Sequence, residues 1–199
     1  MLAYVSKMKL IQNKNFNYNP PKESKFEGII FKEIFIQFTE IKNKFFYDCS
    51  FVNVDFSETD FVNCEFINCN FTNCSLRHTN FKNSNFKNVN GSGFDLRAGS
   101  LIDNNFENCQ FFSSCFRGSR FLNNKINNFQ AMNCDMKNII FKKNNYEKAN
   151  FKQSNFCKSS FVDENFENFN IEDCNTFLCS AKNSKGYENL DVDEYFLII

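Results

Sequence analysis

Residues 64–73 read CEFINCNFTN, and this stretch shows the five-residue repeat that extends along most of the chain. Phe66 and Phe71 lie five positions apart, and each follows a cysteine by two positions. The same frame runs from Phe26 to Ala181 without an insertion, and most of its positions are Phe or another large apolar residue. It accounts for much of the unusual total of 29 Phe in 199 residues. Neither a helix of period 3.6 nor a strand of period 2 produces a strict period of five, so the sequence predicts a repeat architecture.

A second column of small, mostly uncharged residues lies two positions before each large one. Its members include Cys64, Cys69, Thr79 and Ser84. The other three positions of each repeat are polar, and Asn is favoured two positions after the large residue, as at Asn68. Asn tolerates unusual backbone angles and bonds locally to its own chain, so it suits a turn. Each repeat is therefore predicted to form one side of a polygonal coil, with one large and one small side chain inward.

This pattern resembles that of the pentapeptide-repeat family, which is written A-(D/N)-L-x-x with Phe often in place of Leu. The matching runs are CEFIN at 64–68, CNFTN at 69–73, SNFKN at 84–88 and ANFKQ at 149–153. The resemblance implies an all-β fold, a right-handed quadrilateral β-helix in which four repeats make one coil of about 20 residues. Residues 26–181 would then form about eight coils, stacked at the strand spacing of about 4.8 Å.

The two ends of such a rod are sheet edges that need covering. Residues 1–25 are predicted to be an N-terminal capping segment with apolar residues Leu2, Tyr4, Val5, Met8, Leu10 and Ile11. Residues 182–199 are predicted to be a C-terminal cap that carries more apolar residues than a cap needs, among them Leu190, Val192, Tyr195, Phe196 and Leu197. The family resemblance implies a two-fold homodimer through this element, and a cap alone is the alternative.

Two breaks in the frame are predicted to conserve the volume of the interior. Gly91 stands at a large position, and Phe94 stands at the next small one. Phe129 stands at a small position, and Ala131 stands at the adjoining large one. Because protein interiors are close-packed, each pair is expected to exchange roles.

Polar residues occupy the small inward position of one wall in consecutive coils. Asn104, Asn124 and Asn144 are predicted to form an internal amide ladder, which would satisfy their hydrogen-bonding groups. Glu164 is next in this column and is expected to turn towards solvent because a buried charge is costly.

No catalytic residue, cofactor or metal ligand is predicted. Cys64, Cys69 and Cys74 lie on different walls, where thiols pack in the small column and do not converge on a zinc ion. The one His, His78, has no evident Ser or Cys partner for nucleophilic chemistry. The implied interior is filled by side chains and leaves no pocket, so an enzyme is the least favoured interpretation.

Outward residues form two candidate interaction surfaces. One wall carries a basic column one coil apart, Arg77, Arg97, Arg117 and Lys137. Asp95 and Asp135 stand on the same wall, so a solvated, partly neutralised ladder is favoured over a site for phosphates or an acidic partner. Another wall carries an apolar patch, Ile102, Leu122 and Ile140, which either marks a contact surface or is random variation.

The charge balance limits the partners. Lys and Arg total 23, as do Asp and Glu, so the net charge is zero, which argues against a general polyanion binder. No stretch approaches the roughly 20 apolar residues that span a bilayer, and residues 1–15 lack the pattern of a signal peptide. The sequence therefore predicts a cytoplasmic protein without membrane contacts and with reduced cysteines.

The favoured function is a non-enzymatic scaffold or protein-interaction module with an unidentified protein partner. The alternative comes from the resemblance, since some family members mimic DNA, bind a topoisomerase such as gyrase and protect it from quinolones. B-DNA carries one negative charge per about 1.7 Å, whereas this chain has zero net charge, so this alternative ranks second. Direct nucleic-acid binding along the basic column is less favoured still.

Overall fold

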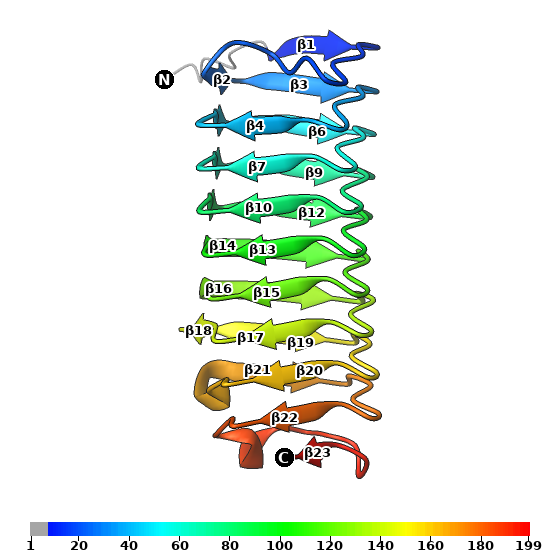
Figure 1. Ribbon diagram of the computed structural model, residues 1–199, viewed down its shortest axis with the longest axis vertical. Coiled ribbons are helices and arrows are strands. Elements are labelled where there is room, and N and C mark those ends of the chain that lie inside the picture. The colour runs from blue at the N-terminus through cyan, green and yellow to red at the C-terminus, as the bar shows by residue number, and fades with distance from the viewer. Residues whose placement is uncertain (1–7) are drawn as a thin grey trace, which may run out of the picture.

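Short strands stacked one above another build a straight rod, with β1 (Lys9–Gln12) at one end and β23 (Leu197–Ile198) at the other (Figure 1). The computed structural model describes residues 8–199. The chain is an all-β parallel solenoid of about nine turns, and its residues pair with residues twenty positions further along, as Phe46 does with Phe66 and Phe66 with Phe86. This register follows from the sequence, because a five-residue repeat on four walls returns to the same wall after four repeats.

Each wall of the rod is a stack of equivalent rungs. The first wall contains β2 (Lys25–Glu27), β5 (Phe45–Tyr47), β8 (Glu65–Ile67), β11 (Asn85–Lys87), the first halves of β14 (Asn105–Phe112) and β16 (Lys125–Met132), and β18 (Asn145–Tyr146). It continues with the 3-10 helices η1 (Phe166–Asn168) and η2 (Tyr187–Asn189). The second wall contains β1 (Lys9–Gln12), β3 (Ile29–Lys32), β6 (Ser50–Val52), β9 (Asn70–Thr72), β12 (Asn90–Ser92), the second halves of β14 and β16, β19 (Ala149–Lys152) and β21 (Phe169–Glu172).

The other two walls differ in regularity. The third wall has isolated parallel bridges, which run from Asn15↔Phe35 to Asn155↔Asn175. The fourth wall contains β4 (Glu40–Lys42), β7 (Asp60–Val62), β10 (Asn80–Lys82), β13 (Ser100–Ile102), β15 (Arg120–Leu122), β17 (Ile140–Lys142), β20 (Ser160–Val162), β22 (Ser180–Lys182) and β23 (Leu197–Ile198). Along each rung the central side chain is buried and its neighbours face outward, as the burial of β8 shows.

Asparagine at the corners has the turn role predicted for it. Asn63 and Asn88 have φ angles of 54° and 53°, in the left-handed region that Asn enters more readily than most residues. Corner side chains also bond along the rod: Asn88 Nδ2 donates to Asn68 Oδ1 at 2.9 Å, and Asn128 Nδ2 donates to Asn108 Oδ1 at 2.8 Å. The corners therefore add side-chain ladders to the backbone ladders.

The core consists of stacked phenylalanine rings. Phe66 lies 4.9 Å from Phe46 and 5.1 Å from Phe86 between ring centroids, with interplanar angles of 8° and 10°. The small inward residues lie beside the rings and bond to the backbone of the preceding coil. Cys69 Sγ donates to the carbonyl of Phe46, and Thr79 Oγ1 donates to that of Phe56. One large and one small inward residue per repeat therefore fill the interior.

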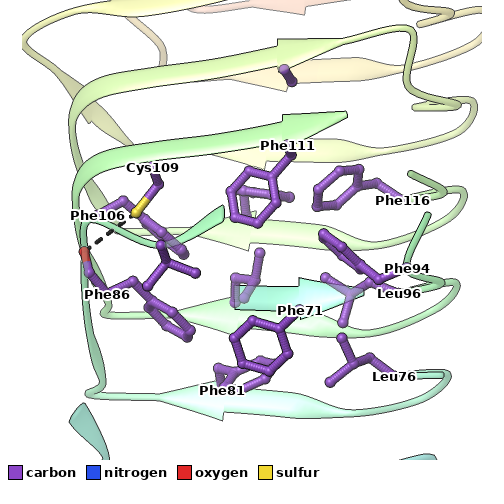
Figure 2. Close-up of a cluster of buried hydrophobic side chains, with 14 of the residues drawn as sticks. Phe71, Leu76, Phe81, Phe86, Phe94, Leu96, Phe106, Cys109, Phe111 and Phe116 are labelled. Carbon is purple, nitrogen blue, oxygen red and sulfur yellow. Dashed lines mark hydrogen bonds between the residues drawn. The ribbon is translucent and has the colours of Figure 1, made fainter. Parts of the chain in front are cut away.

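Both volume exchanges predicted from the sequence are present. Figure 2 shows Phe94 reaching into the space between Phe71 and Phe111, which lie on the rungs to either side of Gly91. A Cβ placed on Gly91 would come within 2.4 Å of Phe94 Cε1, so the two positions share one volume. Phe129 and Ala131 are each only 1% exposed.

The solenoid begins before the boundary expected at residue 26. β1 pairs in register with β3, Ile11 opposite Phe31, and Asn15 bridges to Phe35. Residues 9–16 therefore continue the coil. Leu2, Tyr4 and Val5, predicted to belong to a cap, lie outside the described residues.

The solenoid also continues past residue 181, but with a shortened coil. β23 pairs with β22 in parallel, Ser180 opposite Leu197, an offset of 17 residues. Asp193 fixes this coil, since its Oδ2 accepts bonds from the backbone N–H and hydroxyl of Thr176 at 2.7 and 2.9 Å. The two extensions bring the rod to about nine turns where about eight were expected.

The amide ladder is present and Glu164 belongs to it, which corrects the expectation that Glu164 turns outward. Asn124 Oδ1 accepts from the backbone N–H of Asn104, and Asn144 Oδ1 from that of Asn124. Glu164 is 2% exposed, and its Oε1 accepts from the backbone N–H of Asn144 at 3.2 Å and from Asn144 Nδ2 at 2.9 Å. The two N–H donors of Asn144 hold this carboxyl inside, in the position that an Asn side-chain oxygen takes elsewhere in the ladder.

Candidate functional site

The basic column on the third wall is paired with carboxylates. Arg77 Nε and Arg97 Nη2 each lie 2.6 Å from Asp95 Oδ2, and Arg117 Nη2 lies 2.5 Å from Asp135 Oδ2. Partial burial alone would raise the pKa of Asp95, but hydrogen bonds from Arg97 and Arg77 outweigh it and lower this pKa to about 2. Asp95 and its two arginines therefore form ion pairs with one another, which compete with binding of an external charged ligand.

Lys137, the last residue of the basic column, differs from the three arginines in its contacts. It forms no ion pair with a carboxylate among the described residues, and its backbone N–H donates to Asp135 Oδ1 at 3.2 Å. The arginines of these pairs are exposed to solvent, so each pair contributes little to stability. Two carboxylates interrupt this column by pairing with its three arginines, so it does not present a continuous positive stripe to a phosphate backbone.

The three residues of the apolar patch lie on successive rungs of the fourth wall. Ile102 and Leu122 are register partners on β13 and β15, and Ile140 on β17 is paired with Arg120. Ile140 is 36% exposed, and Ile102 and Leu122 are half-buried. The patch is small, solvent-accessible and fixed on a stiff sheet.

The structure divides the five C-terminal candidates into two groups. Leu190, Val192 and Phe196 pack against the core, so they close the last coil. Tyr195 and Leu197 are 51% and 52% exposed. Within the described residues, β23 pairs only with β22, so its other edge is open.

Sequence reasoning missed the clamp between Asp193 and Thr176. Thr176 is an exception at a large position, and it is 1% exposed with both polar groups bonded to Asp193. A polar residue in an apolar column was the available signal. Its partner could not be found because the offset of 17 residues leaves the repeat frame.

Within the part of the chain that the structure describes, no group of three or more His, Cys, Asp or Glu side chains is placed to hold a metal ion. All ten cysteines are free, and burial raises the pKa of the Cys74 thiol to about 11 and that of Cys134 to about 11. The Cys74 and Cys134 thiols therefore stay protonated at neutral pH, and protonated thiols are poor nucleophiles and metal ligands.

Cavities in the rod are small inside and shallow outside. An apolar void of about 30 Å³ lies in the core near Phe94, and another of about 10 Å³ lies near Phe31. A larger hollow of about 470 Å³ lies at the N-terminal end beside Phe16, Pro20 and Lys25. The core voids are far below the several hundred Å³ of typical ligand pockets. Among residues 8–199, no helix is long and apolar enough to cross a bilayer.

Comparison with known proteins supports the repeat assignment. The family model for pentapeptide repeats matches residues 49–88 with eight copies. HetL from Nostoc sp. strain PCC 7120, a pentapeptide repeat protein involved in regulating heterocyst differentiation, superposes with a TM-score of 0.53 at 8% identity, over 81% of this chain and 79% of HetL. This similarity concerns the fold alone.

Two further solved structures align less closely. The plasmid-mediated fluoroquinolone resistance protein QnrB1 is 15% identical over 96% of this chain and 90% of its own, with a TM-score of 0.38. The pentapeptide repeat protein Rfr23 from Cyanothece 51142 is 12% identical over 71% and 82% of the two chains, with a TM-score of 0.31. No curated protein matches the sequence.

Proposed function

This chain is a pentapeptide-repeat protein, and on that premise we propose that it is a non-enzymatic interaction module whose fourth wall binds another protein. The observation that carries the proposal is the apolar patch of Ile102, Leu122 and Ile140 on three successive rungs, held outward on a rod whose inward positions are filled. Ile102 and Leu122 are register partners, and Ile140 stands on the next rung opposite Arg120. Apolar side chains on a rigid surface bind a partner at little conformational cost. The proposed setting is the cytoplasm, where ten unpaired cysteines remain reduced.

Leu122→Lys is expected to weaken partner binding by about 30-fold, because a charge at the centre of an apolar contact removes a hot-spot contribution of about 2 kcal/mol. The partner is captured from the source cells with the wild-type chain, purified, and titrated by calorimetry. Ile67→Lys on the first wall is the matched control and should bind like the wild type. Equal affinities for Leu122→Lys and the wild type would refute the assignment of this wall.

We also propose that the C-terminal element forms a two-fold homodimer through Tyr195 and Leu197. The exposed edge of β23 and the aromatic pair of Tyr195 with Phe177, at 5.2 Å between centroids, support it. Unpaired strand edges readily pair with another chain.

Leu197→Asp is expected to convert the dimer to a monomer, measured by light scattering in solution. Leu10→Asp is the control, because Leu10 is 53% exposed on β1 at the opposite end of the rod. A wild-type chain that is already monomeric would leave the C-terminal residues as a cap alone.

Mimicry of DNA at a topoisomerase is the second candidate, and the straight stack of coils favours it. A DNA mimic needs free acidic groups, whereas Asp95 and Asp135 on the third wall are paired with arginines. Gyrase supercoiling in the presence of a quinolone distinguishes the two candidates. Protection of the enzyme by this protein would replace our proposal, and its absence at micromolar protein is consistent with it.

A further inference from the structure

The second wall differs from the other three in carrying no charge along most of the rod. The two outward positions on each of the rungs β6, β9 and β12 and the second halves of β14 and β16 are uncharged. Over the same coils the third wall carries Asp95 and Arg117, and the fourth wall carries Asp60 and Arg120. In a chain with 23% charged residues, this wall stands out as an uncharged strip.

The strip is bordered by an amide ladder along one corner. Asn68, Asn88, Asn108 and Asn128 are joined by Nδ2-to-Oδ1 hydrogen bonds of 2.9, 3.2 and 2.8 Å. Each inner amide uses one N–H and one oxygen lone pair within the ladder. A carboxamide has two N–H groups and two lone pairs, so one donor and one acceptor per coil remain for a ligand.

The face of the strip combines amides with an apolar centre. Gln110 and Gln130 are register partners on neighbouring rungs, and so are Phe112 and Met132 beside them. Met132 is 40% exposed and Phe112 is half-buried. An aromatic face therefore lies next to a column of neutral hydrogen-bonding groups.

We propose that this uncharged strip binds an extended, neutral polysaccharide. Sugar hydroxyls both donate and accept, which matches the free donor and acceptor of each amide. The C–H face of a sugar ring packs on an aromatic side chain such as Phe112. Successive rungs rise by about 4.8 Å, which is close to the length of one sugar in an extended chain, so consecutive sugars meet consecutive rungs.

The alternatives fit the strip less well. A polyanion gains nothing from a surface without cations. A second copy stacked on the strip would bury amides such as Asn90 without matched partners, which costs free energy. This proposal concerns the second wall and is independent of the protein-binding patch on the fourth wall.

The test is calorimetric titration of the full chain with cellohexaose, and with a hyaluronan hexasaccharide as the charged comparison. The wild type is expected to bind cellohexaose and not hyaluronan. Phe112→Ala is expected to weaken cellohexaose binding about tenfold. Phe35→Ala removes a phenylalanine that is 51% exposed on the third wall and should leave the affinity unchanged.

Both phenylalanines face outward, so far-UV circular dichroism should show an intact solenoid for each variant. No binding of cellohexaose by the wild type would overturn the proposal. It would also be overturned by equal binding of hyaluronan, by unaltered affinity of Phe112→Ala, or by equal losses in the two variants.

Discussion

Phe129→Ala is expected to lower the free energy of unfolding by about 3–5 kcal/mol, the usual range for removing a fully buried phenylalanine. Its ring lies 5.2 Å from that of Phe111 and 5.8 Å from that of Phe151 between centroids. The adjoining large position holds Ala131, which cannot fill the space left behind. Urea denaturation followed by circular dichroism measures the loss.

The double variant Phe129→Cys with Ala131→Phe is expected to recover most of that loss. It recreates the arrangement of Cys109 and Phe111, which pair with these positions one coil earlier. Ala131→Phe alone should destabilise the rod, because it adds a ring to a filled layer. If the double variant is no more stable than Phe129→Ala, the volume exchange between the two positions is wrong.

Stability is expected to fall by roughly 3 kcal/mol as the pH rises from about 4.5 to about 7, owing to one buried carboxyl. Burial raises the pKa of Glu164 from 4.5 to about 7, although hydrogen bonds from Asn144 oppose the rise. The unfolded state releases this proton at a lower pH than the folded state does. The contribution is therefore complete below the unfolded pKa and is lost as the pH passes the folded pKa.

Glu164→Gln should remove this pH dependence, because a carboxamide keeps the acceptor for Asn144 and carries no charge at any pH. It should also be the more stable protein at pH 8. Glu147→Gln changes an exposed glutamate in the preceding coil and should leave the wild-type profile intact. Thermal unfolding between pH 4.5 and 8 measures both, and parallel profiles for Glu164→Gln and the wild type would contradict the assignment.

The same geometry explains why Glu164 was misplaced by sequence reasoning. Its Oε2 and the hydroxyl of Tyr146 are both buried without a hydrogen-bond partner among the described residues. A charged residue in an inward column argues for an outward turn, and only the preceding Asn144 shows that the ladder can hold a carboxyl. Periodicity gives the wall on which a residue lies, whereas its hydrogen-bond partners depend on the residue one coil away.

The interior of the repeat could be predicted because each five-residue unit has the same environment. Phe66, Cys69 and the Gly91–Phe94 exchange follow from position in the frame and from conservation of volume. The two ends could not be predicted equally well. Pro21 stands at a large position and obscures the frame that Ile11 and Phe16 already follow.

The sequence predicted the wall on which each candidate surface residue lies, but not which side chains form ion pairs there. Wall assignment brought Ile102 and Leu122 together correctly. It placed Asp95 near the arginines without showing that one carboxylate binds both Arg77 and Arg97. Side-chain conformation decides such pairings, and a repeat frame carries no information on it.

Site-specific photo-crosslinking in the source cells tests the proposed interaction function most directly. A benzophenone side chain in place of Leu122 is expected to give a defined adduct with one protein, since this position lies at the centre of the patch. The same group in place of Ile67 on the first wall should give none. No adduct from position 122, or equal adducts from both positions, would contradict the claim that the fourth wall binds a protein partner.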